Sequence, residues 1–309
     1  METATDPQSV ETATAPPLES RRRVSAGVFR ALRKLVRDPA AAAGLVFILL
    51  LVLLAVTGGL LAPYDPLALD IPARLEGPTA DHLLGTDLLG RDLLSRMIAG
   101  TRIGFEIAVP TVALAGLIGV LLGVAGGYLG GLADAVMLYV IDFLAAFPGL
   151  ILALALVTLL GSSIRNIIIA LVFALIPTYA RVARASVLAI KEEGFVLAER
   201  ALGASAWRIA ALHVVPNMIA PIFILVAMDI PIVVLAEAGL SFLGLGVPPP
   251  EPSWGAVLAE GFSNFRESPW PVVWPAVAIG LTMIAFTLVG EALRNILDPR
   301  APGARPRGV

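Results

Sequence analysis

The sequence contains no cysteine, only two lysines and only two histidines. The absence of cysteine excludes disulfides, thiolate metal sites and a cysteine nucleophile, and it carries no information about the cellular compartment. His82 and His213 alone make no credible histidine metal site. Charged residues make up only 15% of the chain and the net charge is −2, so charge by itself indicates neither nucleic acid nor an acidic partner.

A phosphate-binding loop is also missing, because the pattern GxxxxGK[ST] does not occur in the chain. The chain is therefore not expected to hydrolyse ATP itself. Ser241 and Ser253 have no histidine or other base placed beside them in the sequence for nucleophilic chemistry. We assign no catalytic residue, and a membrane enzyme is disfavoured.

Hydrophobic residues are abundant instead, at 58% of the chain. A soluble domain is about half apolar and about a quarter charged, whereas a membrane helix needs about 20 mostly apolar residues. Because backbone groups in a bilayer must be paired internally, such runs are expected to be helices. The sequence predicts six membrane spans, over residues 40–62, 107–133 (starting near 103), 143–164 (entered from about 135), 167–180, 217–240 and 268–290 (starting near 274).

Arginine distribution predicts the orientation of these spans. If the N-terminus is inside, the inner segments carry 16 Lys and Arg residues and the outer segments carry 6. The positive-inside rule then places both termini in the cytoplasm. The first apolar run is too long for a signal peptide and lacks an evident cleavage site, so it is expected to remain as an anchor.

Four segments follow from this topology. They are a cytoplasmic tail over 1–38 whose first 20 residues are expected to be disordered, a first helix with an acidic outer loop over 39–102, a core with five spans over 103–300, and a cytoplasmic tail over 301–309.

The most informative stretch, residues 186–216, is too charged to span and is predicted to lie in the cytoplasm between two spans. Apolar residues recur in it at helical spacing, Gly203 is expected to break or bend the helix, and Pro216 to mark the next span. A helix–glycine–helix of this kind suits docking of a soluble partner. An ordinary amphipathic surface helix is the alternative on periodicity alone.

This stretch resembles the coupling loop of permeases from binding-protein-dependent importers. Their motif reads Glu-Ala-Ala, three residues, Gly, nine residues, Ile, one residue, Leu-Pro, and Ala198, Gly203 and Pro216 stand at matching positions. The departures are Leu197 for Glu, Glu199 for the second Ala, His213 for Ile and Val215 for Leu.

Further segments resemble the peptide and nickel branch of that family, specifically its dipeptide/oligopeptide C-type subunit. The outer-loop motif LGTDLLGRD contains Gly85, Asp87, Gly90, Arg91 and Asp92. The segment LSFLGLG with the following PSWG contains Ser241, Phe242, Gly244, Gly246 and Trp254. The C-terminal matches are Gly290-Glu291, Leu293-Arg294 and residues 297–300.

The outer-loop motif and the LSFLGLG segment each have two interpretations from the residues alone. Asp87, Arg91 and Asp92 can hold a local turn by ion pairing, or they can belong to a surface that contacts an external substrate-binding protein. Glycines and prolines prevent a long continuous helix after Ser241. That segment is either a re-entrant turn near a gate or a plain outer cap.

Four acidic residues fall inside or near spans, where charge is costly and often functional. We expect Glu106 and Glu237 to pair between helices or to lie near an interface. Asp142 and Asp229 have two open readings: pairing between helices, or lining a polar translocation path.

The resemblance implies a type I importer permease, multi-pass in the bacterial cytoplasmic membrane, that moves peptides delivered by an extracytoplasmic binding protein. The implied partners are a second permease subunit and two ATPases that hold ATP and Mg²⁺, with no cofactor in this chain and no nucleic acid. Transport of nickel or another small solute is the alternative. A secondary transporter is less favoured, because no internal repeat is evident.

Overall fold

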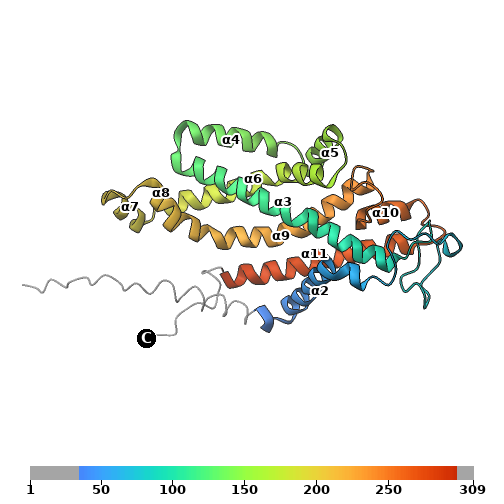
Figure 1. The fold of residues 1–309 in the computed structure, drawn as a ribbon. Coiled ribbons are helices and arrows are strands. Elements are labelled where there is room, and N and C mark those ends of the chain that lie inside the picture. The colour runs from blue at the N-terminus through green and yellow to red at the C-terminus, as the bar shows by residue number, and fades with distance from the viewer. Residues whose placement is uncertain (1–34, 298–309) are drawn as a thin grey trace, which may run out of the picture.

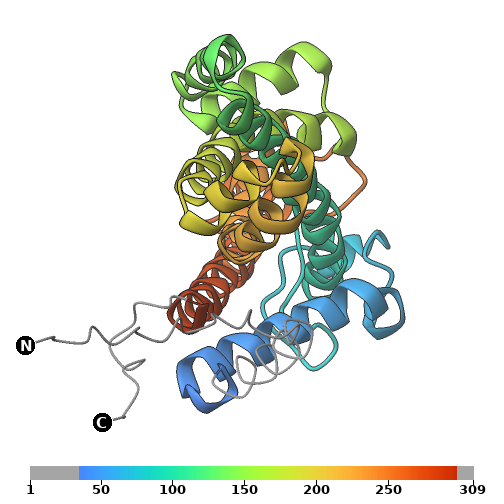
Figure 2. The same ribbon diagram turned by 90° about the vertical axis from the view of Figure 1, so that its left-hand side faces the viewer.

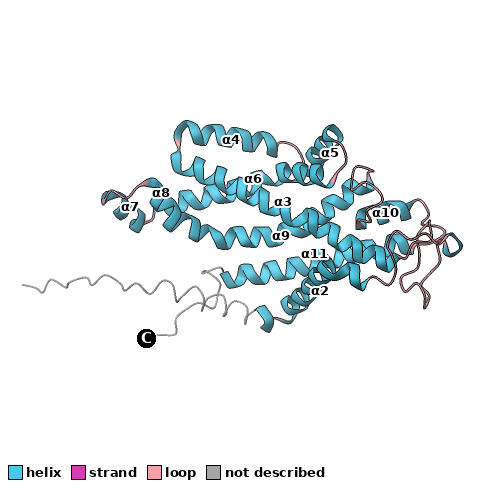
Figure 3. Ribbon diagram, in the orientation of Figure 1, coloured by secondary structure: helices cyan, strands magenta, loops and turns pink. Residues whose placement is uncertain are grey.

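The computed structural model describes residues 35–297, and within that range the chain consists of helices with no β-strand (Figure 1; Figure 3). The prediction of an all-α protein is confirmed. The predictions made for residues 1–20, for most of the N-terminal tail and for the C-terminal tail over 301–309 lie outside the described residues.

Within residues 35–297, ten α-helices, one short 3-10 helix (η1) and one short π-helix (η2) are assigned in order. They are α2 (Pro39–Leu61), η1 (Ile71–Ala73), α3 (Leu93–Leu129), α4 (Gly131–Ala145), α5 (Gly149–Leu160), α6 (Ile164–Lys191), α7 (Gly194–Ala201), α8 (Ala206–Ile209), η2 (Ala210–Val214), α9 (Val215–Phe242), α10 (Trp254–Phe262) and α11 (Trp270–Leu297).

Five helices in this range are long and apolar enough to cross a membrane: α2, α3, α6, α9 with η2, and α11. The pair α4 and α5 passes the same test together but bends by 86° at its break. The predicted count of six is therefore reached when this pair is taken as one broken span. The prediction of a multi-pass membrane protein is confirmed.

The third predicted span, over 143–164, is wrong as a single helix. The helix stops at Ala145 and a new one starts at Gly149. Pro148 explains the break, because proline disfavours helical dihedrals in the residue before it and removes a backbone donor.

Other boundaries also differ from the sequence prediction, including the end of α11, which runs to Leu297 and not to residue 290. Helix α3 begins at Leu93, not near residue 103, because the Asp92 side chain accepts a hydrogen bond from the Ser95 amide at 2.8 Å and caps the helix. The outer loop is correspondingly shorter, over residues 62–92. Helix α6 runs past Arg181 to Lys191, beyond the predicted end at residue 180.

Helices α3 and α6 pack against each other along a row of glycines in α3. A Cβ atom on Gly119 would lie 2.5 Å from the Tyr179 Cβ, and one on Gly127 would lie 3.1 Å from the Val187 Cβ. Small residues at this spacing let two backbones approach closely, which is how membrane helices gain packing energy without a hydrophobic driving force.

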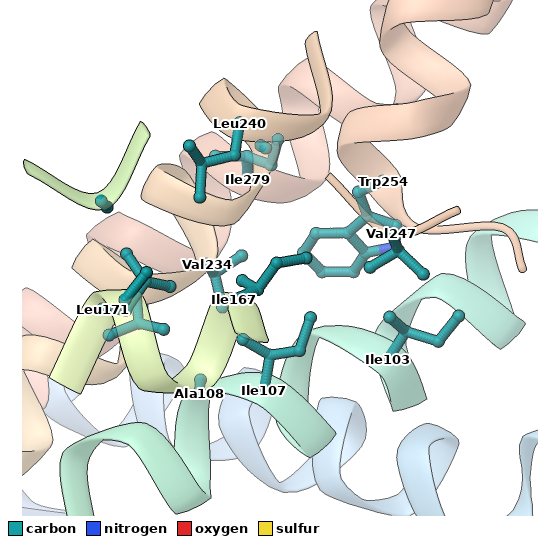
Figure 4. Close-up of a cluster of buried hydrophobic side chains, with 14 of the residues drawn as sticks. Ile103, Ile107, Ala108, Ile167, Leu171, Val234, Leu240, Val247, Trp254 and Ile279 are labelled. Atoms are coloured by element: carbon teal, nitrogen blue, oxygen red, sulfur yellow. The ribbon is translucent and has the colours of Figure 1, made fainter. Parts of the chain in front are cut away.

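The largest buried apolar cluster has most of its residues on α3, α6 and α9 and also takes in residues of α2, α5, α10 and α11 (Figure 4). Ile107, Ile167 and Leu240 are fully buried, and the Trp254 ring projects into the same cluster. The cluster ties the short helix α10 to the membrane-spanning helices. Helix α2 lies at the edge of the bundle instead (Figure 2), and only 17% of its most apolar stretch is buried.

The loops gather at two opposite ends of the molecule. Figure 1 shows α7 and α8 at one end, and α10 with residues 62–92 at the other. The start of α2 and the end of α11 both lie toward the α7–α8 side, so the described chain begins and ends on the same side (Figure 1). This arrangement agrees with cytoplasmic termini.

The topology predicts which sites an impermeant thiol reagent can reach. The natural chain has no cysteine, so a single introduced cysteine is the one thiol in the protein that the reagent can modify. Thr79 and Ser263 are exposed at the outer end, and Glu192 is exposed beside α7. Thr79→Cys and Ser263→Cys are expected to react in intact cells, and Glu192→Cys only after lysis. The reverse pattern contradicts the orientation.

The glycine row predicts an asymmetric response to valine. Gly119→Val forces a side chain into Tyr179, and overpacking of this kind costs about 1–3 kcal/mol. Gly280→Val in α11 is the matched control, because no atom lies within 4 Å of the added Cβ. Thermal unfolding in detergent is expected to show a lower midpoint for Gly119→Val only. Equal midpoints for the two variants contradict the packing.

Candidate functional site

Gly203 forms the turn at the cytoplasmic end, and its geometry explains why glycine stands there. Its φ is +83°, in the left-handed region. The Gly203 amide donates to the Arg200 carbonyl and the Ala204 amide donates to the Glu199 carbonyl, both at 3.0 Å. This is a Schellman motif, which satisfies the last carbonyls of α7. The predicted break at Gly203 is confirmed.

After the turn, the chain enters α9 through a π-helical segment. The Val215 amide donates to the Ala210 carbonyl, five residues back. Pro216 follows and has no amide hydrogen to donate, and a wider turn relieves the clash of its ring with the preceding turn. The predicted start of the span near Pro216 agrees with α9, which begins at Val215.

Other coupling-segment residues predicted from the sequence are brought together here. His213 Nε2 lies 2.9 Å from Glu199 Oε1, and the His213 ring lies 5.3 Å from the Phe195 ring. Ala198 is exposed on α7. Leu202, at the tip of the turn, is 87% exposed. The segment therefore exposes an apolar side chain at the tip of a turn, and contacts of His213 with Glu199 and Phe195 connect the two sides of that turn.

At the opposite end, Asp87 is the centre of the outer-loop motif. Its carboxylate accepts from the Leu89 amide at 2.8 Å and the Arg91 amide at 3.0 Å. It also pairs with the Arg91 side chain at 2.7 Å and with Arg96, which is only 1% exposed. Both arginines reach Glu260 of α10, at 2.7 and 2.8 Å. The local turn by ion pairing, one of the two sequence interpretations, is present.

The two glycines of the motif allow close backbone approaches. Gly85 and Gly90 have φ values of +85° and +75°. A Cβ on Gly85 would lie 2.5 Å from the Glu76 carbonyl oxygen, and one on Gly90 would collide with the Asp70 carbonyl. The absence of side chains at Gly85 and Gly90 therefore lets residues 70–78 pack directly against the motif.

Asp92 has a separate role from Asp87. Besides capping α3, its carboxylate lies 3.0 Å from His82 Nδ1. His82 in turn packs against the Tyr64 ring at a centroid distance of 5.0 Å. Asp92 therefore ties the beginning of α3 to the outer loop that precedes it.

The LSFLGLG segment is held by buried contacts at the same end of the molecule as the outer-loop motif. The Ser241 hydroxyl donates to Glu237 Oε1 at 2.6 Å and lies 3.3 Å from the Ser253 hydroxyl. Gly246 lies against Ser241 so closely that no side chain fits. Gly244 supplies the turn with a φ of +78°.

Trp254 and Phe242 make further contacts that hold this segment. The Trp254 indole donates to the Met97 carbonyl of α3 at 2.9 Å, and Phe242 packs edge-on against Phe262 of α10 at 5.3 Å. Since Glu260 lies on the same helix α10, the outer-loop motif and the LSFLGLG segment form one unit. We call this unit the outer assembly (residues 85–96, 237–246 and 253–262).

The acidic residues within the spans fall in different environments. Asp142 pairs with Arg181 at 2.9 Å, and both side chains are more than half exposed. Asp229 is buried beside Tyr179. Glu237 is fully buried in the outer assembly, whereas Glu106 is exposed. Asp142 and Asp229 thus do not share one cluster.

Sequence reasoning missed several residues of these sites. Arg96 and Glu260 are 164 positions apart, so no local pattern relates them. Asp134 and Arg184 form a two-point ion pair at 2.6 and 2.7 Å between α4 and α6. Within residues 35–297, no three His, Cys, Asp or Glu side chains are placed to hold a metal ion.

Comparison with known proteins gives two family matches. The model described as "Binding-protein-dependent transport system inner membrane component" matches residues 115–302. The model described as "N-terminal TM domain of oligopeptide transport permease C" matches residues 29–78.

Individual relatives match along most of their length. A glutathione transport system permease protein of Pectobacterium atrosepticum is 39% identical over 87% of this chain and 89% of its own. A probable D,D-dipeptide transport system permease protein of Escherichia coli is 38% identical over 86% and 89%. A dipeptide transport system permease protein of Alkalihalophilus pseudofirmus is 33% identical over 93% and 94%. A solved chain of the inward-facing MetNI methionine ABC transporter overlaps 65% of this chain and 97% of its own at 18% identity, with a TM-score of 0.48.

From the contacts in the outer assembly, we expect two arginine replacements to lower the stability of the protein by different amounts. Arg96→Met removes the more deeply buried of the two arginines that pair with Asp87, while Arg91 and two backbone amides still contact the carboxylate. The expected cost is therefore below about 3–5 kcal/mol, the cost of a fully broken buried pair, and above that of an exposed pair. Arg74→Met is the matched control, because its ion pair with Glu267 is long, at 3.8 Å, and exposed. Such surface pairs contribute about 0–1 kcal/mol.

Thermal unfolding of the purified variants is the measurement. A midpoint for Arg96→Met equal to that of Arg74→Met contradicts a stabilising role for the buried pair.

Proposed function

The chain belongs to the family of binding-protein-dependent transport system inner membrane components, and from this premise we propose that it is the permease subunit of an ATP-driven peptide importer. The observation that carries the proposal is the coupling segment. It leaves the membrane between α6 and α9, turns at Gly203 and exposes apolar side chains at its tip. Family membership and this geometry support docking of a separate ATPase.

ATP and Mg²⁺ belong to the partner in this proposal. The chain has no GxxxxGK[ST] loop to cradle phosphates. Its own contribution is a small docking element. Leu202, Leu197 and Phe195 are all exposed on that element, and clustered exposed apolar side chains commonly mark an interaction site. Two ATPase subunits are proposed, one for each permease of a pair.

The Asp142–Arg181 pair supports a second permease subunit as a partner. Asp142 lies 11 residues into α4, about 16 Å along the helix. Arg181 lies 10 residues before the end of α6, about 15 Å from it. Both positions lie about 15 Å along their helices from the ends that face the coupling segment, and charge that faces lipid within a span is costly.

We propose that this face of α4 and α6 meets protein or water rather than lipid. A polar translocation path between two permeases satisfies that requirement, and Asp142 is its proposed lining residue. Asp229 is proposed for the same path. Its burial beside Tyr179 means that it reaches the path only after movement of α6 against α9.

The outer assembly is the proposed contact for an extracytoplasmic substrate-binding protein. It lies at the end opposite the coupling segment (Figure 1), where the loop over residues 62–92 provides acidic groups. The buried ion pairs keep this surface fixed, so a docked protein meets a preformed shape. The LSFLGLG segment, which forms the end of α9 and the first residues of the loop to α10, is the proposed gate element.

Peptides are the proposed cargo, because relatives of this chain are named as dipeptide and glutathione transport permeases. Nickel, the alternative from the sequence, has no such support among them. The proposed location is the bacterial cytoplasmic membrane, with the coupling segment inside.

Gly203→Val tests the coupling segment. A β-branched residue is strained at a φ of +83°, at a cost of about 1–3 kcal/mol, although no atom lies within 4 Å of the added Cβ. The membrane helices do not depend on this turn for burial. We expect normal membrane levels and normal pairing with the second permease, little copurifying ATPase and little ATP-driven uptake of a labelled dipeptide.

The matched control is Gly194→Val, at the beginning of α7. Its added Cβ also meets no atom within 4 Å, and Gly194 has no positive φ. It is expected to retain more ATPase and uptake than Gly203→Val. Normal uptake by Gly203→Val contradicts the docking role, and ATP-driven uptake of nickel but not peptide contradicts the cargo.

A further inference from the structure

A cavity of about 450 Å³ lies beside the outer assembly. Its wall is formed by α2 and the loop that follows it, by α3, by the beginning of α6 and by the loop before α10. Three charged residues line it, Arg102 and Glu106 of α3 and Glu251 of the loop, and the other lining residues are glycine, alanine, proline or isoleucine. We propose that this cavity binds both ends of a short peptide: Arg102 binds the carboxylate, and Glu106 and Glu251 bind the ammonium group.

The three charged groups are available to a ligand. All three residues are exposed, and within residues 35–297 the arginine of α3 that forms ion pairs is Arg96, not Arg102. Arg102 and Glu106 are four positions apart, so their Cβ atoms lie about 5–6 Å from each other on one face of the helix. An acidic residue that follows the basic one is the less favourable order for an ion pair within a helix.

Glu251 is held beside α3 by its neighbours in the loop. A Cβ on Gly100 would lie 2.8 Å from the Pro252 carbonyl oxygen and 2.7 Å from Cδ1 of Trp254. The Trp254 indole also donates to the Met97 carbonyl. Because Gly100 has no side chain, the loop rests directly on α3 and brings Glu251 to the wall of the cavity. A preformed site of this kind lowers the ordering cost of binding.

Charges of both signs in one cavity suit a zwitterion better than a simple ion. The ends of an extended dipeptide are about 7 Å apart, and Arg102 and Glu106 differ by about 6 Å along the axis of α3. A guanidinium binds a carboxylate through two parallel hydrogen bonds. The inference rests on the proposed function, because peptide reaches this end first only if the binding protein docks there. A zwitterionic lipid headgroup carries the same two charges, so the experiment separates the two ligands.

The experiment is photolabelling of the purified importer, which is the chain with its copurified subunits, by a dipeptide with a diazirine side chain. The binding protein is left out, and mass spectrometry locates the label. We expect label on α3 and on the loop before α10, at the cavity. Acetylation or amidation of the dipeptide is expected to lower the labelling about fivefold to tenfold, as for one lost charged hydrogen bond in an open site. This comparison needs no change to the protein.

Neutral variants identify which group binds which end. Arg102→Met is expected to lower labelling by the free dipeptide to the level of the amidated one, and to leave labelling by the amidated dipeptide unchanged. Glu106→Gln combined with Glu251→Gln is expected to have the same relation to the acetylated dipeptide. Arg165→Met is the matched control, because Arg165 is exposed at the beginning of α6 but does not line the cavity. It is expected to label as the natural chain does.

Equal losses for free and amidated dipeptides in Arg102→Met, or label away from the cavity, overturn the peptide site and leave the proposed function intact. Labelling by a photoreactive phosphatidylethanolamine that depends on Arg102, with none by the dipeptide, assigns the cavity to a lipid headgroup. Loss of the second permease from Arg102→Met assigns Arg102 to the subunit interface. Both results overturn the inference. If the natural importer takes up no peptide in the presence of its binding protein and ATP, the proposed function fails first.

Discussion

The close approach of α3 and α6 is the constraint on which the rest of the structure depends. Glycines at 116, 119, 123 and 127 remove side chains from one face of α3, and α6 fills that face with Tyr179, Ala180, Ala183 and Val187. The pair links the two ends of the molecule, because α3 begins in the outer assembly at Leu93 and α6 ends at the coupling segment at Lys191. A shift of one helix along the other would therefore move residues at both ends of the molecule.

Helix α9 provides a second connection between the ends. It starts at the π-helical turn behind the coupling segment and ends at Phe242 in the outer assembly. Both of its ends are anchored. Glu237 and Ser241 are buried and hydrogen bonded at the outer end, and Val214 and Met218 are buried against Ala183 and Val187 of α6 at the cytoplasmic end. Helix α9 therefore connects the two ends by packing at each of them.

Sequence reasoning succeeded where a property is local and failed where it depends on distant partners. Hydropathy located the spans, and glycine chemistry located the turn at Gly203 because a positive φ needs no long-range information. The start of α3 was placed too late, since Arg96 and Arg102 interrupt the apolar run. Arg96 is tolerated in the helix because Asp87 and Glu260 neutralise it, and Glu260 is far away in the sequence. The α4–α5 break was missed because Pro148 in an apolar run fits either a kinked helix or two helices.

The central claim is that this chain moves peptides only as part of an ATP-driven assembly. The most direct measurement is dipeptide uptake into proteoliposomes that contain the purified chain, alone or with its copurified subunits, with ATP sealed inside or withheld. Uptake is predicted only when the partner subunits and ATP are both present, and the chain alone is predicted not to hydrolyse ATP. Uptake by the chain alone, driven by an ion gradient, would contradict the account and identify a secondary transporter.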